Sequence, residues 1–202
     1  MKNIISLVLV AVIIFLGYLL YVNIKEPIVF EQVKDERKAK VVNKLETIRT
    51  AQEVFKLVTG KYAHDFDTLS QVINNDTITI KTIFGDKDDL NSTEEFREVF
   101  TYKSAKDSLM SLLAKNKYPI LNLDSLRYVP YTNGEMFTIA ADTMTYQSTL
   151  VNVVEVGTRW KNFMGKYGSI KYSKYDNSYD PNSTIKFGDM NSPNLAGNWP
   201  MN

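Results

Sequence analysis

The 202-residue chain has no cysteine, a single histidine and an almost balanced charge, with 24 basic residues against 23 acidic ones. The lack of cysteine excludes a disulfide framework, a thiolate metal site, a cysteine nucleophile and lipid attachment through cysteine. The balanced charge provides no field that would steer nucleic acid or an acidic substrate. The sequence therefore indicates neither a nucleic-acid partner nor a small-molecule substrate.

Catalytic and metal-binding patterns are missing too. No glycine-rich phosphate loop follows a predicted strand, and no Gly-x-Ser-x-Gly element is found. His64 lies beside Asp65 and Asp67, which are too few ligands for a metal site. The acidic clusters lack calcium-loop spacing and suit turns or a helix start; they are Asp86 to Asp89, Glu94 with Glu95, and Asp176, Asn177 and Asp180. We expect no catalytic residue, metal or cofactor, and a protein that is not an enzyme.

One long apolar run is present, from Ile4 to Val22, without a single charged residue. As a helix it reaches about 28 Å, close to the thickness of a hydrocarbon core. No A-x-A-like cleavage site follows it, and Tyr18 and Tyr21 suit the membrane interface. Residues 1–24 are therefore predicted to be an uncleaved signal-anchor transmembrane helix.

The two flanks of this run disagree about sidedness. Lysine and arginine are more frequent after the run than before it, which favours a cytoplasmic body. Long domains, however, translocate largely regardless of charge, and the short N-terminal tail, the missing cysteine and the Tyr/Asn/Ser-rich body favour export. We expect a single-pass inner-membrane protein whose C-terminal domain is periplasmic.

A second helix is predicted from Glu31 to Val58, after a kink or restart at Pro27. Its apolar residues recur every three or four positions, and Leu45, Ile48 and Phe55 are expected to form a core stripe. The opposite face is expected to be charged; it carries Lys38, Lys40, Lys44, Glu46, Arg49 and Glu53. The charged segment 31–40 is expected to project as a stalk, and Gly60 to cap the helix in the left-handed conformation.

The body alternates short helices and strands. A helix capped by Asp65 or Asp67 runs to Ile73, a strand covers Thr77 to Phe84, and a helix covers Asp107 to Lys115. Ser92-x-x-Glu95 is a capping-box pattern, but 96–102 could equally be a strand.

Further on, Asn133-Gly134 separates two extended runs and predicts a hairpin between Tyr128 and Ala140, and another strand is predicted over Val151 to Val156. The predicted fold class is α+β, with the long helix laid across a small antiparallel sheet. Residues 25–164 form this domain. The Tyr/Asn/Gly-rich tail, 165–202, is predicted to be loop packed on the domain, with contact candidates Tyr172, Tyr175, Tyr179 and Trp199.

The helix ends in Ala51-Gln-Glu-Val-Phe55-Lys56-Leu-Val-Thr-Gly60-Lys61-Tyr62, followed by Phe66-Asp-Thr-Leu69. Over about the first 75 residues the chain resembles the type IV pilin fold, most of all the major pseudopilins of type II secretion. The resemblance implies a hydrophobic helix that continues into the amphipathic one and packs on a small sheet. The span lacks the Gly-Phe-Thr-Leu-(I/V)-Glu peptidase site of that family and holds no acidic residue. This favours a pilin-like protein that stays in the membrane over a filament subunit.

The tripeptide Asp-(Ser/Thr)-apolar occurs five times, several times more often than composition predicts. It resembles the O-glycosylation acceptor motif of exported Bacteroidetes proteins, although helix caps and turns favour the same pair of residues. The candidate acceptors are Thr68, Thr77, Ser108, Ser125 and Thr143.

Two functional hypotheses follow. The first is a non-enzymatic structural subunit of a cell-envelope assembly, in secretion or a surface organelle, whose partners are other envelope proteins or further copies of the chain. The alternative is a membrane-tethered module that binds glycan or peptide through the C-terminal Tyr/Trp surface.

Overall fold

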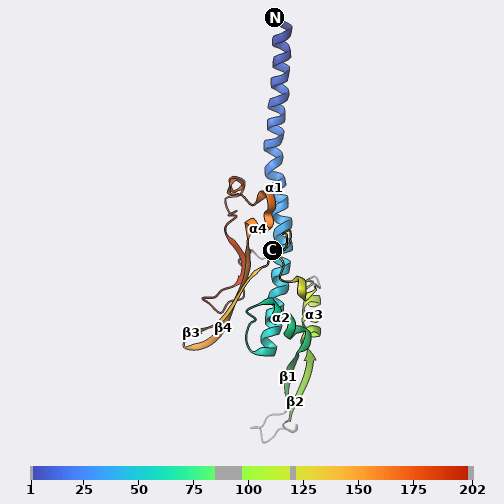
Figure 1. The fold of residues 1–202 in the computed structure, drawn as a ribbon, viewed down its shortest axis with the longest axis vertical. Coiled ribbons are helices and arrows are strands. Elements are labelled where there is room, and N and C mark those ends of the chain that lie inside the picture. Colours follow the sequence, from blue (N-terminus) through green and yellow to red (C-terminus); the bar gives the residue numbers. More distant parts are fainter. Residues whose placement is uncertain (1, 85–96, 119–121, 200–202) are drawn as a thin grey trace.

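The computed structural model describes residues 2–84, 97–118 and 122–199. It is an α+β fold with a pilin-like arrangement, in which small antiparallel sheets and short helices pack around the C-terminal half of one long helix, α1 (Lys2–Thr59) (Figure 1). From residue 4 to residue 25 every side chain is exposed, and packing begins at Glu26. This confirms the predicted fold class.

Helix α1 runs without interruption through Pro27, so the expected restart of the helix there is wrong. Proline removes one backbone hydrogen bond, a loss that packing of the neighbouring turn can offset. Here Phe30, one turn further on, is fully buried and fixes the helix on its C-terminal side. Among the described residues, one helix, α1, is long and apolar enough to cross a membrane, by its length and composition.

The predicted core stripe of α1 is confirmed. Leu45 and Ile48 are fully buried and Phe55 nearly so. One residue of the face expected to be charged is also buried: Glu46 forms an ion pair with Arg49 on its own helix. Tyr118 lies against this turn, where burial and then the charge of Glu46 raise the pKa of its hydroxyl. Tyr118 thus covers a face that helical periodicity alone assigned to solvent.

The segment 31–40 is no free stalk, which corrects that expectation. Lys34 Nζ lies 2.6 Å from Asp176 Oδ2, and Arg37 donates to the carbonyl of Phe163 at 2.5 Å. Long cationic side chains can keep a charged head polar while their stems pack against the fold. The C-terminal residues use this property to attach to α1.

The end of α1 follows the prediction. Gly60 has φ +78°, and its N–H donates to the carbonyl of Lys56 at 2.8 Å. The buried amide of Gln52 then exchanges two hydrogen bonds with the backbone of Ala63, at 2.9 and 3.0 Å. This pair returns the chain to α2 (Phe66–Asn75), whose N-cap is Asp65, the first of the two predicted alternatives.

The predicted strand over Thr77 to Phe84 is β1 (Thr77–Phe84). It pairs antiparallel with β2 (Arg97–Ser104), from Thr77 opposite Ser104 to Phe84 opposite Arg97. The segment left open between helix and strand is therefore a strand from 97 onward, and α3 (Ala105–Lys115) follows it. The capping-box pattern Ser92 to Glu95 lies outside the described residues.

The Asn133-Gly134 turn returns the chain as predicted, but not within a regular hairpin. Val129 N–H donates to Glu135 O, and Phe137 N–H to Arg127 O, both at 2.8 Å, around a single bridge. The short 3-10 helix η1 (Leu123–Ser125) precedes this turn.

The regular hairpin is β3 (Thr138–Tyr146) with β4 (Thr149–Arg159). It turns through Gln147 and Ser148, both at positive φ. Neither residue is glycine or asparagine, so the sequence carries no cue for this turn.

The tail is loop-rich, as predicted, but it also contributes a strand that the sequence analysis did not predict. After α4 (Trp160–Met164) and two 3-10 helices, η2 (Gly165–Tyr167) and η3 (Ile170–Lys174), β5 (Thr184–Gly188) pairs with β4. Ile185 and Phe187 are buried on one face of β5. The second sheet therefore has the order β3-β4-β5, and the tail forms one edge of it.

Candidate interaction surfaces

A cluster of aromatic rings joins the C-terminal tail to α1. Phe30 lies at its centre, with ring centroids 5.2 to 6.1 Å from those of the four tail tyrosines, Tyr167, Tyr172, Tyr175 and Tyr179. We call these five residues the aromatic collar. Such offset and edge contacts add to the free energy of burial, and they tie residues about 140 positions apart in the sequence.

Polar bonds reinforce the aromatic collar. The hydroxyl of Tyr175 donates to Glu26 at 2.5 Å and lowers the pKa of that carboxyl. Burial tends to raise the pKa of Asp176, but the Lys34 ammonium and the donors of Ser178 prevail and lower it to about 2. Burial raises the pKa of Tyr179 to about 12, with a further contribution from Asp180.

The four predicted contact residues fall into two groups. Tyr172 and Tyr179 are buried in the aromatic collar, while Tyr175 and Trp199 are partly exposed. Tyr179 and Trp199 also line an open pocket of about 440 Å³ beside α1, together with Lys34 and Trp160. Contact of these residues with a partner stays a prediction; within the chain, the three tyrosines hold the tail to α1.

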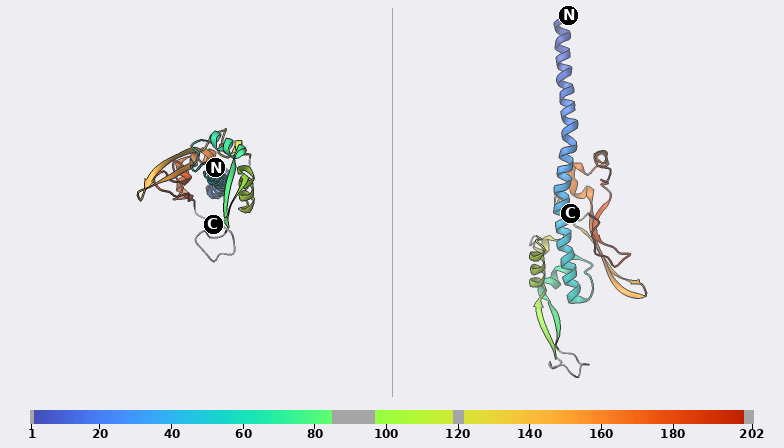
Figure 2. Two further views of the ribbon diagram at one scale, coloured as in Figure 1. Left: turned by 90° about the horizontal axis from the view of Figure 1, so that it is seen from below. Right: turned by 180° about the vertical axis from the view of Figure 1, so that it is seen from behind.

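A second exposed apolar surface, besides that of α1, belongs to β1 and β2, which we call the β1–β2 ribbon. It projects past the C-terminal end of α1 (Figures 1 and 2). Of its 16 residues only Ile78, at the base, is buried. Directly opposed residues share a face, so both faces carry exposed large apolar side chains: Ile83, Phe100 and Tyr102 on one, and Ile80, Phe84 and Val99 on the other.

Strand β1 was predicted from the sequence, but this surface was not. Charged side chains lie among these apolar residues. Lys81 pairs with Glu98 at 2.7 Å, and the Arg97 guanidinium lies 4.9 Å from the Phe84 ring centroid. The sequence signal that could have indicated this surface is the presence of apolar residues on both faces of β1. A strand with only one covered face alternates apolar and polar residues instead.

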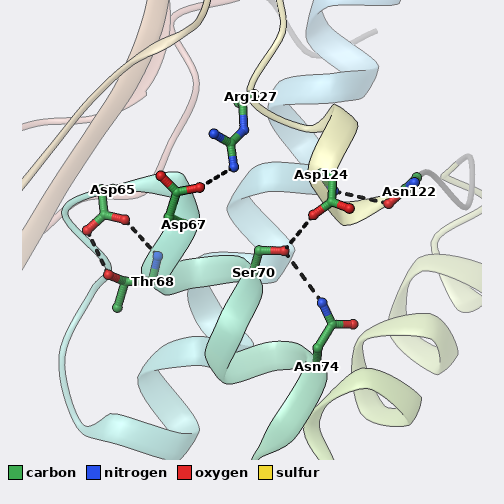
Figure 3. A network of polar contacts seen from close by, with 8 residues as sticks. All are labelled: Asp65, Asp67, Thr68, Ser70, Asn74, Asn122, Asp124 and Arg127. Atoms are coloured by element: carbon green, nitrogen blue, oxygen red, sulfur yellow. Dashed lines mark hydrogen bonds and ion pairs between the residues drawn. The ribbon is translucent and has the colours of Figure 1, made fainter.

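The five Asp-(Ser/Thr) positions differ in accessibility. Figure 3 shows the network at the start of α2, where the Thr68 hydroxyl donates to Asp65 at 2.8 Å. Ser125, beside the same network, is half-buried and donates to Asn122 O, and Ser108 is buried and donates to Ser104 O. Thr77 and Thr143 are exposed. Glycosylation stays a prediction for all five, and these two offer the most accessible hydroxyls.

The same network joins α2 to the loop before the Asn133-Gly134 turn. Asp67 and Arg127 pair at 2.5 Å, and Ser70 donates to Asp124 at 3.2 Å (Figure 3). These contacts tie α2 to the loop, and they account for the polar side chains drawn in Figure 3 as structural links between the two segments.

Of the candidate metal ligands, His64 is exposed and lies 3.0 Å from Asp65. Asp176 is occupied by Lys34 and Ser178, and Asp180 accepts from the backbone of Asn182. Within residues 2–84, 97–118 and 122–199, no group of three or more potential ligands is placed to hold a metal ion. Asp86, Asp88, Asp89, Glu94 and Glu95 lie outside the described residues.

Comparisons of the chain with protein-family models, with curated proteins and with solved structures give no match.

Proposed function

We propose that this protein is a non-enzymatic, single-pass membrane protein whose pilin-like domain is a structural subunit of a cell-envelope assembly. The observation that carries the proposal is the β1–β2 ribbon, which bears large apolar side chains on both faces at the end of the domain remote from the N-terminal half of α1. Large exposed apolar patches on a folded domain commonly mark sites of interaction with another protein or with a membrane.

The exposed N-terminal half of α1 supports anchorage. Its apolar residues from 4 to 22 are exposed among the residues that the structure describes, and its length suits one membrane span. We place the protein in the inner membrane, with the domain periplasmic and the span retained as a signal anchor. Because the chain has no cysteine, Leu150→Cys supplies a single exposed thiol. In cells whose outer membrane alone has been permeabilised, a membrane-impermeant maleimide should label this thiol. Labelling only after lysis of the inner membrane would place the domain in the cytoplasm.

The assembly role is tested by extracting the tagged protein from its own membranes in mild detergent and measuring particle size and composition. We expect a large particle with stoichiometric partners or further copies of the chain. The triple variant Ile83→Thr, Phe100→Thr and Tyr102→Thr should reduce the particle to a monomer while the domain stays folded, because threonine keeps strand propensity.

The matched control removes three exposed apolar side chains elsewhere, with Met136→Thr, Tyr146→Thr and Leu150→Thr. It should leave the particle intact. A wild-type monomer, or equal loss in both triple variants, would contradict the proposal.

The alternative, a tethered binding module for glycan or peptide, is favoured by the pocket beside Tyr179 and Trp199. Deleting 165–202 is no clean test, because it removes β5 and most of the aromatic collar. Trp199→Ala is better, since that ring is only partly buried. Loss of glycan-array or peptide binding in this variant, with the particle unchanged, would favour the module.

A further inference from the structure

The dipeptide Lys-Tyr occurs three times between α4 and β5, at 166–167, 171–172 and 174–175. Each tyrosine belongs to the aromatic collar, whereas each lysine is exposed. The three ammonium groups lie 4.7, 4.7 and 4.5 Å from the ring centroids of the tyrosines that follow them. The tyrosines thus face α1, and the lysines make the outer surface of the collar basic.

This basic surface lies close to the expected edge of the membrane. The hydroxyl of Tyr175 contacts Glu26, only four residues after the last residue of the apolar run, Val22, which is about 6 Å along the helix. The polar layer on each side of the hydrocarbon core is roughly 5–8 Å thick. In Figures 1 and 2 the segment between α4 and β5 forms the end of the domain nearest the N-terminal half of α1. It therefore lies at headgroup level when the apolar run spans the bilayer.

The same segment exposes an apolar residue among its lysines. Ile170 is 63% exposed and directly precedes Lys171. Lys25, on α1, adds a fourth cation, with its ammonium 5.3 Å from the ring of Tyr21. Of the neighbouring carboxylates, Asp176 pairs with Lys34, while Glu26 accepts from Tyr175 and keeps its negative charge, so the four lysines outnumber it. Apolar residues flanked by lysine are the composition that binds an anionic membrane surface.

We propose that residues 165–175 form a second membrane contact, in which Ile170 enters the interface and Lys166, Lys171 and Lys174 bind the phosphates of anionic phospholipids. Through the aromatic collar this contact fixes the domain against the bilayer, so that the β1–β2 ribbon points away from it. The inference rests on membrane anchorage and is independent of the assembly role.

A single spin label tests the contact, since Ile170→Cys gives the full-length chain its only thiol. The labelled protein is placed in nanodiscs of pure phosphatidylcholine or with a third of phosphatidylglycerol. Accessibility to oxygen and to a water-soluble nickel chelate is then compared. The control is Leu150→Cys, at the β3–β4 turn and 73% exposed. We expect the ratio of oxygen accessibility to nickel-chelate accessibility to be several-fold higher at position 170 than at position 150, and higher still with phosphatidylglycerol. Equal ratios at the two positions in both lipids would overturn the proposal.

The lysines are tested by the triple variant Lys166→Gln, Lys171→Gln and Lys174→Gln in the Ile170→Cys background. The matched control, Lys103→Gln, Lys106→Gln and Lys115→Gln, removes the same charge from β2 and α3. We expect the phosphatidylglycerol effect to disappear only in the first variant, with unchanged melting in both because all six lysines are exposed. Equal behaviour of the two variants would refute the lysine contact, and particle size in mild detergent would still test the assembly role separately.

Discussion

The two sheets of this domain have the same antiparallel pairing and opposite environments. In the β3-β4-β5 sheet, Val154, Val156 and Phe187 are buried against α1 and its neighbours. In the β1–β2 ribbon almost every side chain is exposed. Two-stranded ribbons are marginal in water by themselves. Backbone pairing alone therefore does not place a sheet in the core. The apolar residues of the ribbon remain exposed, where another molecule could contact them.

The largest expected effect compares one substitution in the core with the same one in the ribbon. Phe55→Asp buries an unpaired carboxylate in the α1 stripe and should unfold the domain, at a cost of more than about 4 kcal/mol. Phe100→Asp, at a side chain 51% exposed, should leave the domain folded. Circular dichroism melts of the detergent-solubilised proteins measure this, and a folded Phe55→Asp variant would refute the assignment of α1 as the core helix.

A smaller effect compares the two sheets directly. Phe187→Ala removes a fully buried ring from β5 and should cost about 3–5 kcal/mol. Phe100→Ala in β2 should change the free energy of unfolding by about 0.5 kcal/mol, as surface substitutions do. Urea titrations of both variants give the two values; similar losses would mean that the ribbon is packed as tightly as the sheet.

The smallest effect concerns the bond between α1 and the tail. The pKa of Asp176 is about 2, below its ordinary 3.8, so the ionised carboxylate stabilises the fold above pH 3.8 and this contribution is lost as the pH falls through 2. Asp176→Asn should lower the free energy of unfolding by about 1–2 kcal/mol at neutral pH and flatten its dependence between pH 4 and 2. The control is Asp142→Asn, at an exposed position on β3. Chemical denaturation at several pH values checks both variants; an unchanged pH profile in Asp176→Asn would contradict the pairing with Lys34.

Sequence reasoning predicted the elements whose signals are local. The stripe of Leu45, Ile48 and Phe55 follows from helical periodicity, the Asp65 cap from its side chain, and β1 from its residues. Strand β5 was missed because Thr184 to Gly188 lies among turn formers, although Ile185 and Phe187 alternate correctly.

The interaction surfaces depend on contacts that no local pattern contains. Tyr172 and Tyr179 were predicted as contact residues from composition, yet their rings pack on Phe30, more than 140 residues earlier in the chain. The exposure of the β1–β2 ribbon follows from where the other elements pack. Only the three-dimensional arrangement determines which strands remain uncovered.

Photocrosslinking in living cells tests most directly whether the ribbon, and not the sheet, contacts a partner. A benzophenone amino acid replaces Phe100 in the ribbon or, as the control, Leu150 at the tip of the β3–β4 hairpin. We expect a discrete crosslinked species from position 100 and none from position 150. No crosslink at 100, or equal crosslinks at both positions, would contradict the claim that the β1–β2 ribbon is the surface that contacts a partner.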